Sequence, residues 1–312
     1  MKKFYGVKYT EKLQEGKNPV WFLSEGKKLA GNVFIPKNFK QGEKLPAIVT
    51  VTPAGAVKEQ TAGQHALALS EKGFITLAFD HRTFGESEGF PRAKEDPFMK
   101  AEDIKNAITF MSCLDEVNED KIGLLGICSG AGYAAFAASF DVRAKAVATI
   151  SGIFDFAGWG ASMQLNDLLK KSASARKTYY LTGEAEYVNA WYGEYDESVI
   201  FWREAKEYYR EGGSRGHYEV TNGDYRDAQC IDMRYMLNAN ATLKYLAPRP
   251  ILAIRGSVAV TGPMSDEAIE SAAEPKELFM VEGATHIDMY HIEEYVRQSV
   301  EKLDKFYRQY FK

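Results

Sequence analysis

The fold is decided by the stretch Lys121–Phe140, which reads KIGLLGICSGAGYAAFAASF. Its first part, Lys121–Ile127, is a short apolar run of the kind that forms a buried strand. A glycine-rich turn follows at residues 126–130. The remainder consists of small and apolar residues, which are typical of a closely packed helix. The pattern therefore predicts a strand, a sharp turn and a helix in direct succession.

The turn has the form G-x-C-x-G, with Gly126 and Gly130 on either side of Cys128. In the related G-x-S-x-G turn, the central residue carries the nucleophile in a strained conformation at the tip between strand and helix. Small residues are needed two before and two after it because the backbone is crowded there. A turn centred on Ser129 would place Ile127 at a crowded position. Cys128 is therefore the predicted nucleophile, and a buried, inert cysteine is the alternative.

This position also favours a reactive thiol. Cys128 would lie at the N-terminus of the helix that begins near Ser129, where the helix dipole favours a thiolate. The backbone N–H of Ser129 would then point at the oxyanion that develops on a bound acyl group.

Further short apolar runs alternate with amphipathic helical patterns, which indicates a mostly parallel sheet with helices on both faces. Helical spacing of apolar residues is found at about 101–114 and from about Ile292 onward. Two early segments, Val20–Ser24 and Leu29–Pro36, indicate an antiparallel start. The other expected strands are Ala47–Pro53, Phe74–Asp80, Ala144–Ser151, Pro250–Ser257 and Lys276–Gly283.

The region from Phe154 to Leu243 breaks this alternation. It contains no buried-strand run, and its pattern is helical, polar and rich in Tyr and Trp. A stretch this long between two strands is not a loop. We interpret residues 154–243 as a helical lid inserted over the carboxyl ends of the strands, with residues 1–153 and 244–312 as the core. The alternative is an aromatic patch that packs on the sheet or on a second subunit.

Four stretches together resemble the dienelactone-hydrolase-like branch of the α/β-hydrolase superfamily, and they are spread over most of the chain outside 154–243. The resemblance implies an α/β-hydrolase fold, and dienelactone hydrolases themselves carry a cysteine in the turn. The chain departs from the family pattern at Thr52, where relatives often have His, and at Val260, where many have the acid. The stretches are Val51–Thr61, Phe79–Arg92, Gly126–Ala134 and Pro275–Tyr290.

The order nucleophile, acid, histidine is expected along the chain of such a protein. Of the five histidines, only His286 stands just beyond the last expected strand and before the last helix. A neutral imidazole there can take the thiol proton and later return it to a leaving group. A solvated loop histidine is the alternative.

The acid is expected shortly after Gly256, but residues 256–261 read GSVAVT and contain no carboxylate. The first acids downstream are Asp266 and Glu267, and Asp155 follows the preceding strand. We take Asp266 as the expected acid, because the intervening loop could fold back, and leave Glu267 and Asp155 as alternatives. A Cys–His pair depends less on a third member than a Ser–His pair, because the thiol is the more acidic nucleophile.

The resemblance also implies a second oxyanion donor in the loop after Val51. Ala54 is the expected donor, with Gly55 as the next candidate. The Gly/Ala composition of this loop suits a backbone that approaches a ligand closely.

Side chains that could bind substrate lie in two places. Arg82 follows the strand that ends at Asp80 and could hold a substrate carboxylate. A structural ion pair of Arg82 with Asp80 or Glu86 is the interpretation that we prefer. Three tryptophans of the expected lid offer flat apolar area for an aromatic or bulky apolar group. They are Trp159, Trp191 and Trp202.

The composition limits the classes of partner that this chain is expected to bind. A net charge of -4 over 312 residues, with no basic stripe, argues against nucleic acid. No apolar run follows the N-terminal lysines and none is long enough for a bilayer, so neither a secretory signal nor a membrane partner is expected. Three cysteines without CxxC or Cys/His spacing argue against disulfides and zinc and indicate the cytoplasm. We expect no metal or cofactor, and a homo-oligomer is possible.

The expected reaction is acyl transfer to water. Cys128 would attack the carbonyl of an ester, lactone or thioester, with His286 as base and Asp266 as acid. The amides of Ser129 and Ala54 would hold the oxyanion. Two other functions stay open: a degenerate member of the fold that binds a small hydrophobic ligand without turnover, and a redox- or electrophile-sensing thiol.

Overall fold

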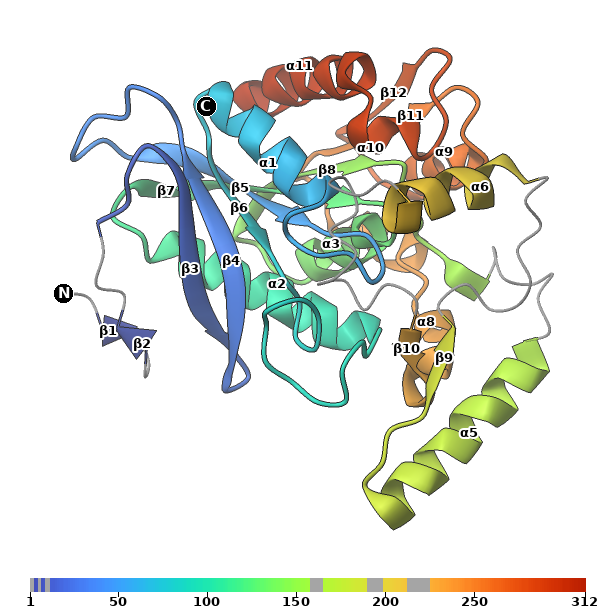
Figure 1. Ribbon diagram of the computed structural model, residues 1–312. Coiled ribbons are helices and arrows are strands. Elements are labelled where there is room, and N and C mark those ends of the chain that lie inside the picture. Colours follow the sequence, from blue (N-terminus) through green and yellow to red (C-terminus); the bar gives the residue numbers. More distant parts are fainter. Residues whose placement is uncertain (1–2, 5–6, 9–11, 158–164, 190–198, 212–224) are drawn as a thin grey trace.

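An eight-stranded sheet forms the centre of the molecule (Figure 1). The computed structural model describes residues 3–4, 7–8, 12–157, 165–189, 199–211 and 225–312. Across the sheet the strands follow the order β12 (Lys276–Val281), β11 (Ile251–Gly256), β8 (Ala144–Ile150), β7 (Val117–Ile127), β5 (Leu45–Val51), β6 (Ile75–Phe79), β4 (Lys27–Ile35) and β3 (Gly16–Ser24).

The sheet is mostly parallel. Strands β12 through β6 in this order pair in parallel, whereas β4 pairs antiparallel with both β6 and β3. The inner strands read as nearly continuous apolar runs because helices cover both of their faces. The predicted α/β fold with an antiparallel start is therefore confirmed. A separate antiparallel hairpin joins β1 (Lys3–Phe4) to β2 (Val7–Lys8).

Helices lie on both faces of the sheet (Figure 1). On one face are α1 (Thr61–Glu71), α10 (Asp288–His291) and α11 (Glu293–Tyr310). On the other are α2 (Pro97–Ser112), α3 (Ser129–Ser139) and α9 (Gly262–Ser271). The apolar side of α11 is buried against the sheet, as its spacing predicts. Among the described helices, none combines the length and apolar character needed to cross a bilayer.

Between β8 and β11 the described chain is mostly helical, as expected for residues 154–243. Its helix α5 extends away from the sheet in Figure 1 and buries only Ser172 and Ala175. A short antiparallel pair of strands was not indicated by the sequence pattern. The elements are α5 (Leu165–Thr182), β9 (Tyr187–Asn189), α6 (Ile200–Lys206), η1 (Glu207–Glu211), β10 (Tyr225–Asp227), η3 (Ala228–Cys230), α8 (Ile231–Met236) and η4 (Asn240–Tyr245).

Candidate active site

Cys128 occupies the turn between β7 and α3, with a backbone φ of 56°. This left-handed conformation is strained for a residue other than glycine. A Cβ at Gly126 would lie 2.4 Å from the carbonyl oxygen of Gly130, and one at Gly130 would lie 2.6 Å from the carbonyl oxygens of Val51 and Thr52. The backbone crowding predicted from the spacing of the two glycines is therefore present around Cys128.

The Cys128 side chain is buried, with 7% of the residue exposed. Burial raises the pKa of its thiol above the ordinary value, because a thiolate there loses its hydration. Hydrogen bonds from the Tyr290 hydroxyl, the Ser129 hydroxyl and the Ser129 backbone N–H act in the opposite direction and do not overcome it. The group at rest is a thiol at neutral pH. Burial therefore acts against the helix N-terminus, which was expected to favour a thiolate.

His286 lies in the loop between β12 and α10 and is 1% exposed. Its Nδ1 is 2.5 Å from the Thr261 hydroxyl oxygen, and its Nε2 is 2.8 Å from the Tyr290 hydroxyl oxygen. Burial lowers the pKa of the imidazole to about 3, so the ring is neutral at neutral pH. His286 is therefore a buried, oriented imidazole and not a solvated loop residue.

Tyr290 connects the imidazole to the thiol. Its hydroxyl lies 2.8 Å from Nε2 of His286, and its action on the Cys128 sulfur lowers the pKa of the thiol. Burial holds the pKa of the phenol well above its usual value, so the group keeps its proton. The phenol, the imidazole and the Thr261 hydroxyl thus form a continuous hydrogen-bonded chain, and the thiol lies at its Tyr290 end.

The expected acid, Asp266, does not contact His286. Its two carboxylate oxygens accept hydrogen bonds from Arg255 at 2.7 and 3.0 Å. The reason is geometric: the turn after β11 is short, so Thr261, directly before α9, reaches the ring. Asp266 lies further along α9, where Arg255 of β11 meets it. A hydroxyl therefore stands where the acid was expected, and that assignment is corrected.

The two alternative acids do not replace it. Glu267 lies on an exposed position of α9. Asp155 accepts hydrogen bonds from the Ala157 backbone N–H at 3.0 Å and from the Asn238 amide at 2.8 Å. Within the described ranges, both ring nitrogens of His286 face hydroxyl groups and no carboxylate.

The loop after β5 lies beside the turn at Cys128, because Gly130 packs against the end of β5. The backbone N–H of Gly55 is engaged, since it donates to the Glu95 carboxylate at 2.9 Å. The Ala54 carbonyl accepts from Arg226 at 3.3 Å. With Gly55 committed to Glu95, Ala54 stays the better candidate for the second oxyanion donor.

Glu95 supports this loop from a fully buried position. Besides Gly55, its carboxylate accepts from Lys100 Nζ at 2.5 Å and from the Tyr133 hydroxyl at 2.9 Å. Burial alone would raise the pKa of Glu95, but Lys100, Arg226 and Arg234 nearby lower it to about 2. The loop after β5 is therefore tied to a buried carboxylate that stays ionised.

Arg82 forms a structural ion pair, although not with either partner expected from the sequence. Its Nε lies 2.5 Å from Asp103 and its Nη2 donates to the Met99 carbonyl at 3.0 Å. The expected partners, Asp80 and Glu86, are instead bound by Lys58 (2.9 and 2.5 Å). The Arg82 guanidinium is thus used to join the loop after β6 to α2.

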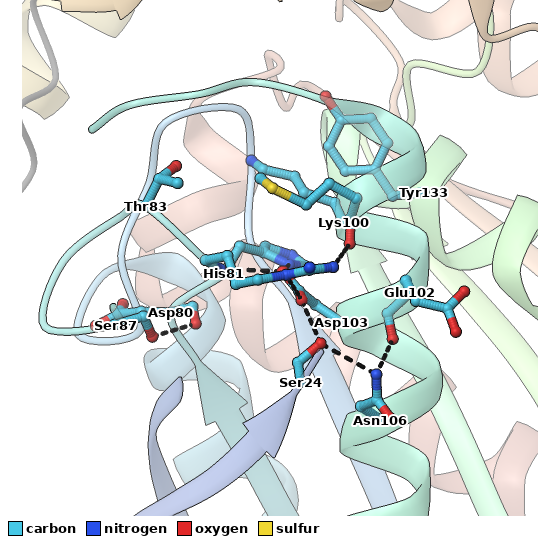
Figure 2. Close-up of polar contacts among 12 residues, drawn as sticks. Ser24, Asp80, His81, Thr83, Ser87, Lys100, Glu102, Asp103, Asn106 and Tyr133 are labelled. Atoms are coloured by element: carbon cyan, nitrogen blue, oxygen red, sulfur yellow. Dashed lines mark hydrogen bonds and ion pairs between the residues drawn. The ribbon is translucent and has the colours of Figure 1, made fainter. Parts of the chain in front are cut away.

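Figure 2 shows Asp103 with Ser24, His81 and Asn106 around its carboxylate. Together with Arg82, whose Nε binds Asp103, these residues form what we call the Asp103 cluster. The fully buried Asp103 carboxylate accepts from the Ser24 hydroxyl at 2.6 Å and lies 3.4 Å from His81 Nδ1. Asn106 in turn donates to Ser24 at 3.0 Å. The cluster ties β3, the loop after β6 and α2 together.

The segment between β8 and β11 contacts the site through α6 and η1. The ring of Phe201 meets the His286 imidazole edge to face at a centroid distance of 4.9 Å, and Tyr208 meets Tyr290 at 5.4 Å. Trp202, partly buried, packs on Phe201 at 4.9 Å. Trp202 is thus one ring removed from His286, while Trp159 and Trp191 lie outside the described residues.

Three functional residues were missed by sequence reasoning: Thr261, Tyr290 and Glu95. Tyr290 could have been found from its nearness in the sequence, since it stands four residues after His286 in the short helix α10. Thr261 has a weaker signal, as a hydroxyl residue in a loop without acids. The role of Glu95 depends on contacts between distant segments and has no local signal.

The parallel sheet, the strained turn at Cys128 and the histidine after the last strand define an α/β hydrolase. A family model described as X-Pro dipeptidyl-peptidase (S15 family) matches residues 25–223, which is more than half of the chain. The chain belongs to this family.

Two bacterial relatives resemble the chain over most of its length. Protein PA2218 of Pseudomonas aeruginosa is 37% identical over 84% of this chain and 72% of its own. Its crystal structure has a TM-score of 0.86 to this chain, covering 94% and 93% of the two chains at 32% identity. Protein YcjY of Escherichia coli is 34% identical over 90% of this chain and 94% of its own.

More distant solved structures share the fold. The polyketide transferase GrgF of Penicillium sp. is 25% identical over 80% of this chain and 84% of its own. Its structure, described as an α/β hydrolase, has a TM-score of 0.80 and covers 95% and 99% of the two chains at 24% identity. A dienelactone hydrolase from Anabaena variabilis reaches 0.58 over 96% and 100% at 14% identity, which shows the fold alone. The α/β-hydrolase superfamily predicted from the sequence is confirmed.

Proposed function

We propose that this chain is a hydrolase that cleaves a carboxylic ester, lactone or thioester through an acyl-enzyme on Cys128. The observation that carries the proposal is the placement of the Cys128 thiol at a strained strand–helix turn beside Tyr290, whose hydroxyl is 2.8 Å from Nε2 of the buried His286 imidazole. Covalent catalysis requires a nucleophile connected to a base, and a third group that orients the base. Here Cys128 would be the nucleophile, His286 the base, and Thr261 the group that orients the imidazole through Nδ1.

In the first step, the Cys128 sulfur attacks the substrate carbonyl carbon and the thiol proton is transferred to His286. The carbonyl oxygen becomes an oxyanion that accepts hydrogen bonds from the backbone N–H groups of Ser129 and Ala54. Collapse of this intermediate breaks the bond to the leaving alcohol or thiol, which takes the proton from His286. The product is a thioester between the acyl group and Cys128.

In the second step, water attacks this thioester and gives its proton to His286. Collapse of the second oxyanion breaks the bond to sulfur, the acid is released and Cys128 regains its proton from His286. A neutral imidazole is the form that can accept a proton, and the low pKa of His286 keeps it in that form over the physiological range. No metal or organic cofactor takes part in this scheme.

The insertion supports the choice of a small-molecule acyl substrate. Phe201 of α6 packs on the ring of His286, and Trp202 packs on the ring of Phe201. We therefore retain residues 154–243 as a lid that shapes the acyl or alcohol pocket, and expect groups that carry a ring or medium-length chain to be preferred over acetyl groups. The name of the relative GrgF, a polyketide transferase, supports chemistry on a bulky acyl group. A cytoplasmic location is supported by three free cysteines.

Burst kinetics with a p-nitrophenyl ester test the proposal. The wild type should release p-nitrophenol in a burst followed by turnover, and Cys128→Ala should show neither while unfolding at the wild-type urea concentration. Cys128→Ser should fold but turn over poorly, because a hydroxyl needs a better-supported base than His286 provides. Hydrolysis by Cys128→Ala at the wild-type rate would remove Cys128 from the mechanism.

The two other functions give different results in the same experiment. A burst without turnover would indicate a degenerate protein that binds and traps an acyl group. Peroxide-dependent loss of the thiol without any acyl adduct would indicate a sensing thiol.

A further inference from the structure

The Tyr290 hydroxyl lies between the two groups that must exchange a proton. It is 2.8 Å from His286 Nε2, and its action on the Cys128 sulfur lowers the pKa of the thiol. Within the described residues, the ring of His286 contacts Thr261, Tyr290 and Phe201 and makes no hydrogen bond to the sulfur. Because Nδ1 faces Thr261 and Nε2 faces Tyr290, the route from the thiol to the imidazole passes through the phenol.

The phenol is held in this position from several sides. Tyr290 is 1% exposed, and its ring packs edge to face on His286 at 5.4 Å and on Tyr208 of η1 at 5.4 Å. Its backbone carbonyl accepts a hydrogen bond from the Thr61 hydroxyl of α1 at 3.2 Å. A side chain packed this tightly cannot swing out of the route without opening the core.

We propose that Tyr290 is the proton relay of the active site, carrying the proton between the Cys128 thiol and His286 in both steps. This inference rests on the proposed function. In acylation, the thiol proton moves to the Tyr290 oxygen while the phenolic proton moves to Nε2 of His286. The sulfur forms its bond to the acyl carbon, and Tyr290 ends the step as a neutral phenol. His286 then gives this proton to the departing alcohol or thiol. In deacylation His286 takes a proton from the attacking water, and the two transfers run in reverse, so that the departing Cys128 sulfur regains a proton through Tyr290.

Thr261 completes the chain at its far end. When Nε2 accepts the relayed proton, Nδ1–H of the imidazolium donates to the Thr261 hydroxyl oxygen. Two other groups also act on the thiol: Arg234 of α8 favours the thiolate by its charge, and the buried Tyr209 of η1 lies near it. Tyr290 is the group that we place between the sulfur and the imidazole, since its hydroxyl lies 2.8 Å from Nε2.

Tyr290→Phe tests the relay, because it removes one oxygen and keeps the ring. The first readout is the pH dependence of Cys128 alkylation by iodoacetamide, which needs no ester substrate. Loss of the phenol's hydrogen bond to the thiolate should slow alkylation at pH 8 by about tenfold or more. The second readout is the acylation rate with a p-nitrophenyl ester, which should fall by about a hundredfold, within the range for a lost proton-transfer group.

Tyr307→Phe is the matched control. Tyr307 is also a fully buried tyrosine, but its hydroxyl donates to the Leu124 carbonyl under α11 at 2.6 Å, away from the thiol. The control should lose stability without changing thiol alkylation or acylation. Equal effects of the two variants would reduce Tyr290 to a packing residue and overturn the relay.

A measurement on the wild type covers the case in which Tyr290→Phe does not fold. Acylation rates are measured in mixtures of H₂O and D₂O. A relay moves two protons in one step, so the plot of rate against deuterium fraction should be bowed. A straight line would mean that a single proton moves, and would overturn the relay.

The outcomes separate the relay from the proposed function. If the wild type forms an acyl adduct but Tyr290→Phe is alkylated and acylated at unchanged rates, the relay is overturned. The proposed function is then unaffected. Faster acylation in Tyr290→Phe overturns it too, because the phenol would then be blocking a direct thiol–imidazole contact. Absence of any adduct in the wild type overturns the proposed function, and the relay with it.

Discussion

Two buried imidazoles of this chain are held in opposite ways. His81 lies 3.4 Å from the Asp103 carboxylate, which also binds Ser24 (Figure 2). The same carboxylate binds Arg82. His286, in the candidate active site, lies between the hydroxyls of Thr261 and Tyr290. Burial lowers the pKa of both rings. The histidine–carboxylate contact usually associated with catalysis is therefore used here to hold the fold, and the reaction site is built from neutral groups.

The difference has an energetic basis. An unpaired charge is costly in a buried site, whereas a closed chain of neutral donors and acceptors is not. At rest the chain from Cys128 to Thr261 carries no formal charge, and the imidazolium forms only during the reaction. The Asp103 cluster instead keeps a permanent carboxylate, which the Arg82 guanidinium balances.

The largest expected effect comes from breaking the Asp103 cluster. Asp103→Asn would leave the mostly buried Arg82 guanidinium without its counter-charge, so we expect a loss of about 3–5 kcal/mol in the free energy of unfolding. Urea denaturation measures it. The control is Asp304→Asn, which removes the exposed pair with Arg308 and should cost at most about 0.5 kcal/mol. Similar losses in both variants would mean that the Asp103 cluster contributes no more than a surface pair.

The second effect concerns the group behind His286. Thr261→Val keeps the shape of the side chain but leaves Nδ1 of the ring without its partner. We expect kcat/KM for an activated ester to fall by about ten- to a hundredfold, equivalent to about 1–3 kcal/mol. Asp266→Asn loses only its partly exposed pair with Arg255 and should stay within about twofold of the wild type. The reverse ranking would return the role of the acid to Asp266.

This contrast also shows how far the sequence could predict the molecule. The strands and the turn at Cys128 follow from local patterns, because apolar runs and glycine spacing report burial and crowding directly. The position of His286 follows from the order of the elements. Thr261 and Asp266 are only five residues apart, and which of them reaches the ring depends on how α9 leaves β11. That geometry is set by tertiary packing, and so are the partner of Arg82 and the role of Glu95.

The third effect is a pH dependence of stability shared by the buried imidazoles. Burial lowers the pKa of His65 to about 4 and that of His286 to about 3, against about 6.5 in the unfolded chain. Below pH 6.5 the unfolded state therefore binds protons that the native state does not. These two rings contribute fully to the free energy of unfolding above pH 6.5. As the pH falls toward 4, the free energy of unfolding decreases by up to about 1.4 kcal/mol per pH unit for each ring.

Urea unfolding between about pH 7 and pH 5 measures this slope, since most carboxylates stay ionised in both states over that range. His65→Leu removes one such ring from α1. The plot of the free energy of unfolding against pH should then become less steep, by the amount that the uptake of one proton contributes. An unchanged slope would show that His65 is protonated alike in the native and unfolded states.

The smallest expected effect tests the lid. Trp202→Ala removes a partly buried ring that packs on Phe201, one ring away from His286. We expect kcat/KM for an aromatic ester to fall by about 1 kcal/mol, the low end for a filled apolar contact, and that for an acetyl ester to change less. Equal losses on both esters would make Trp202 part of the lid's own core and not of the substrate pocket.

The central claim is that Cys128 carries the acyl group during the reaction, and the mass of the trapped intermediate tests it most directly. The protein is mixed with a p-nitrophenyl ester of an aromatic acid, quenched with acid within the burst, and analysed intact and after proteolysis. We predict an increase by the mass of one acyl group, located on the peptide that contains Cys128, and none in Cys128→Ala. An acyl group on another residue, or turnover by the wild type with no adduct at any quench time, would contradict the claim.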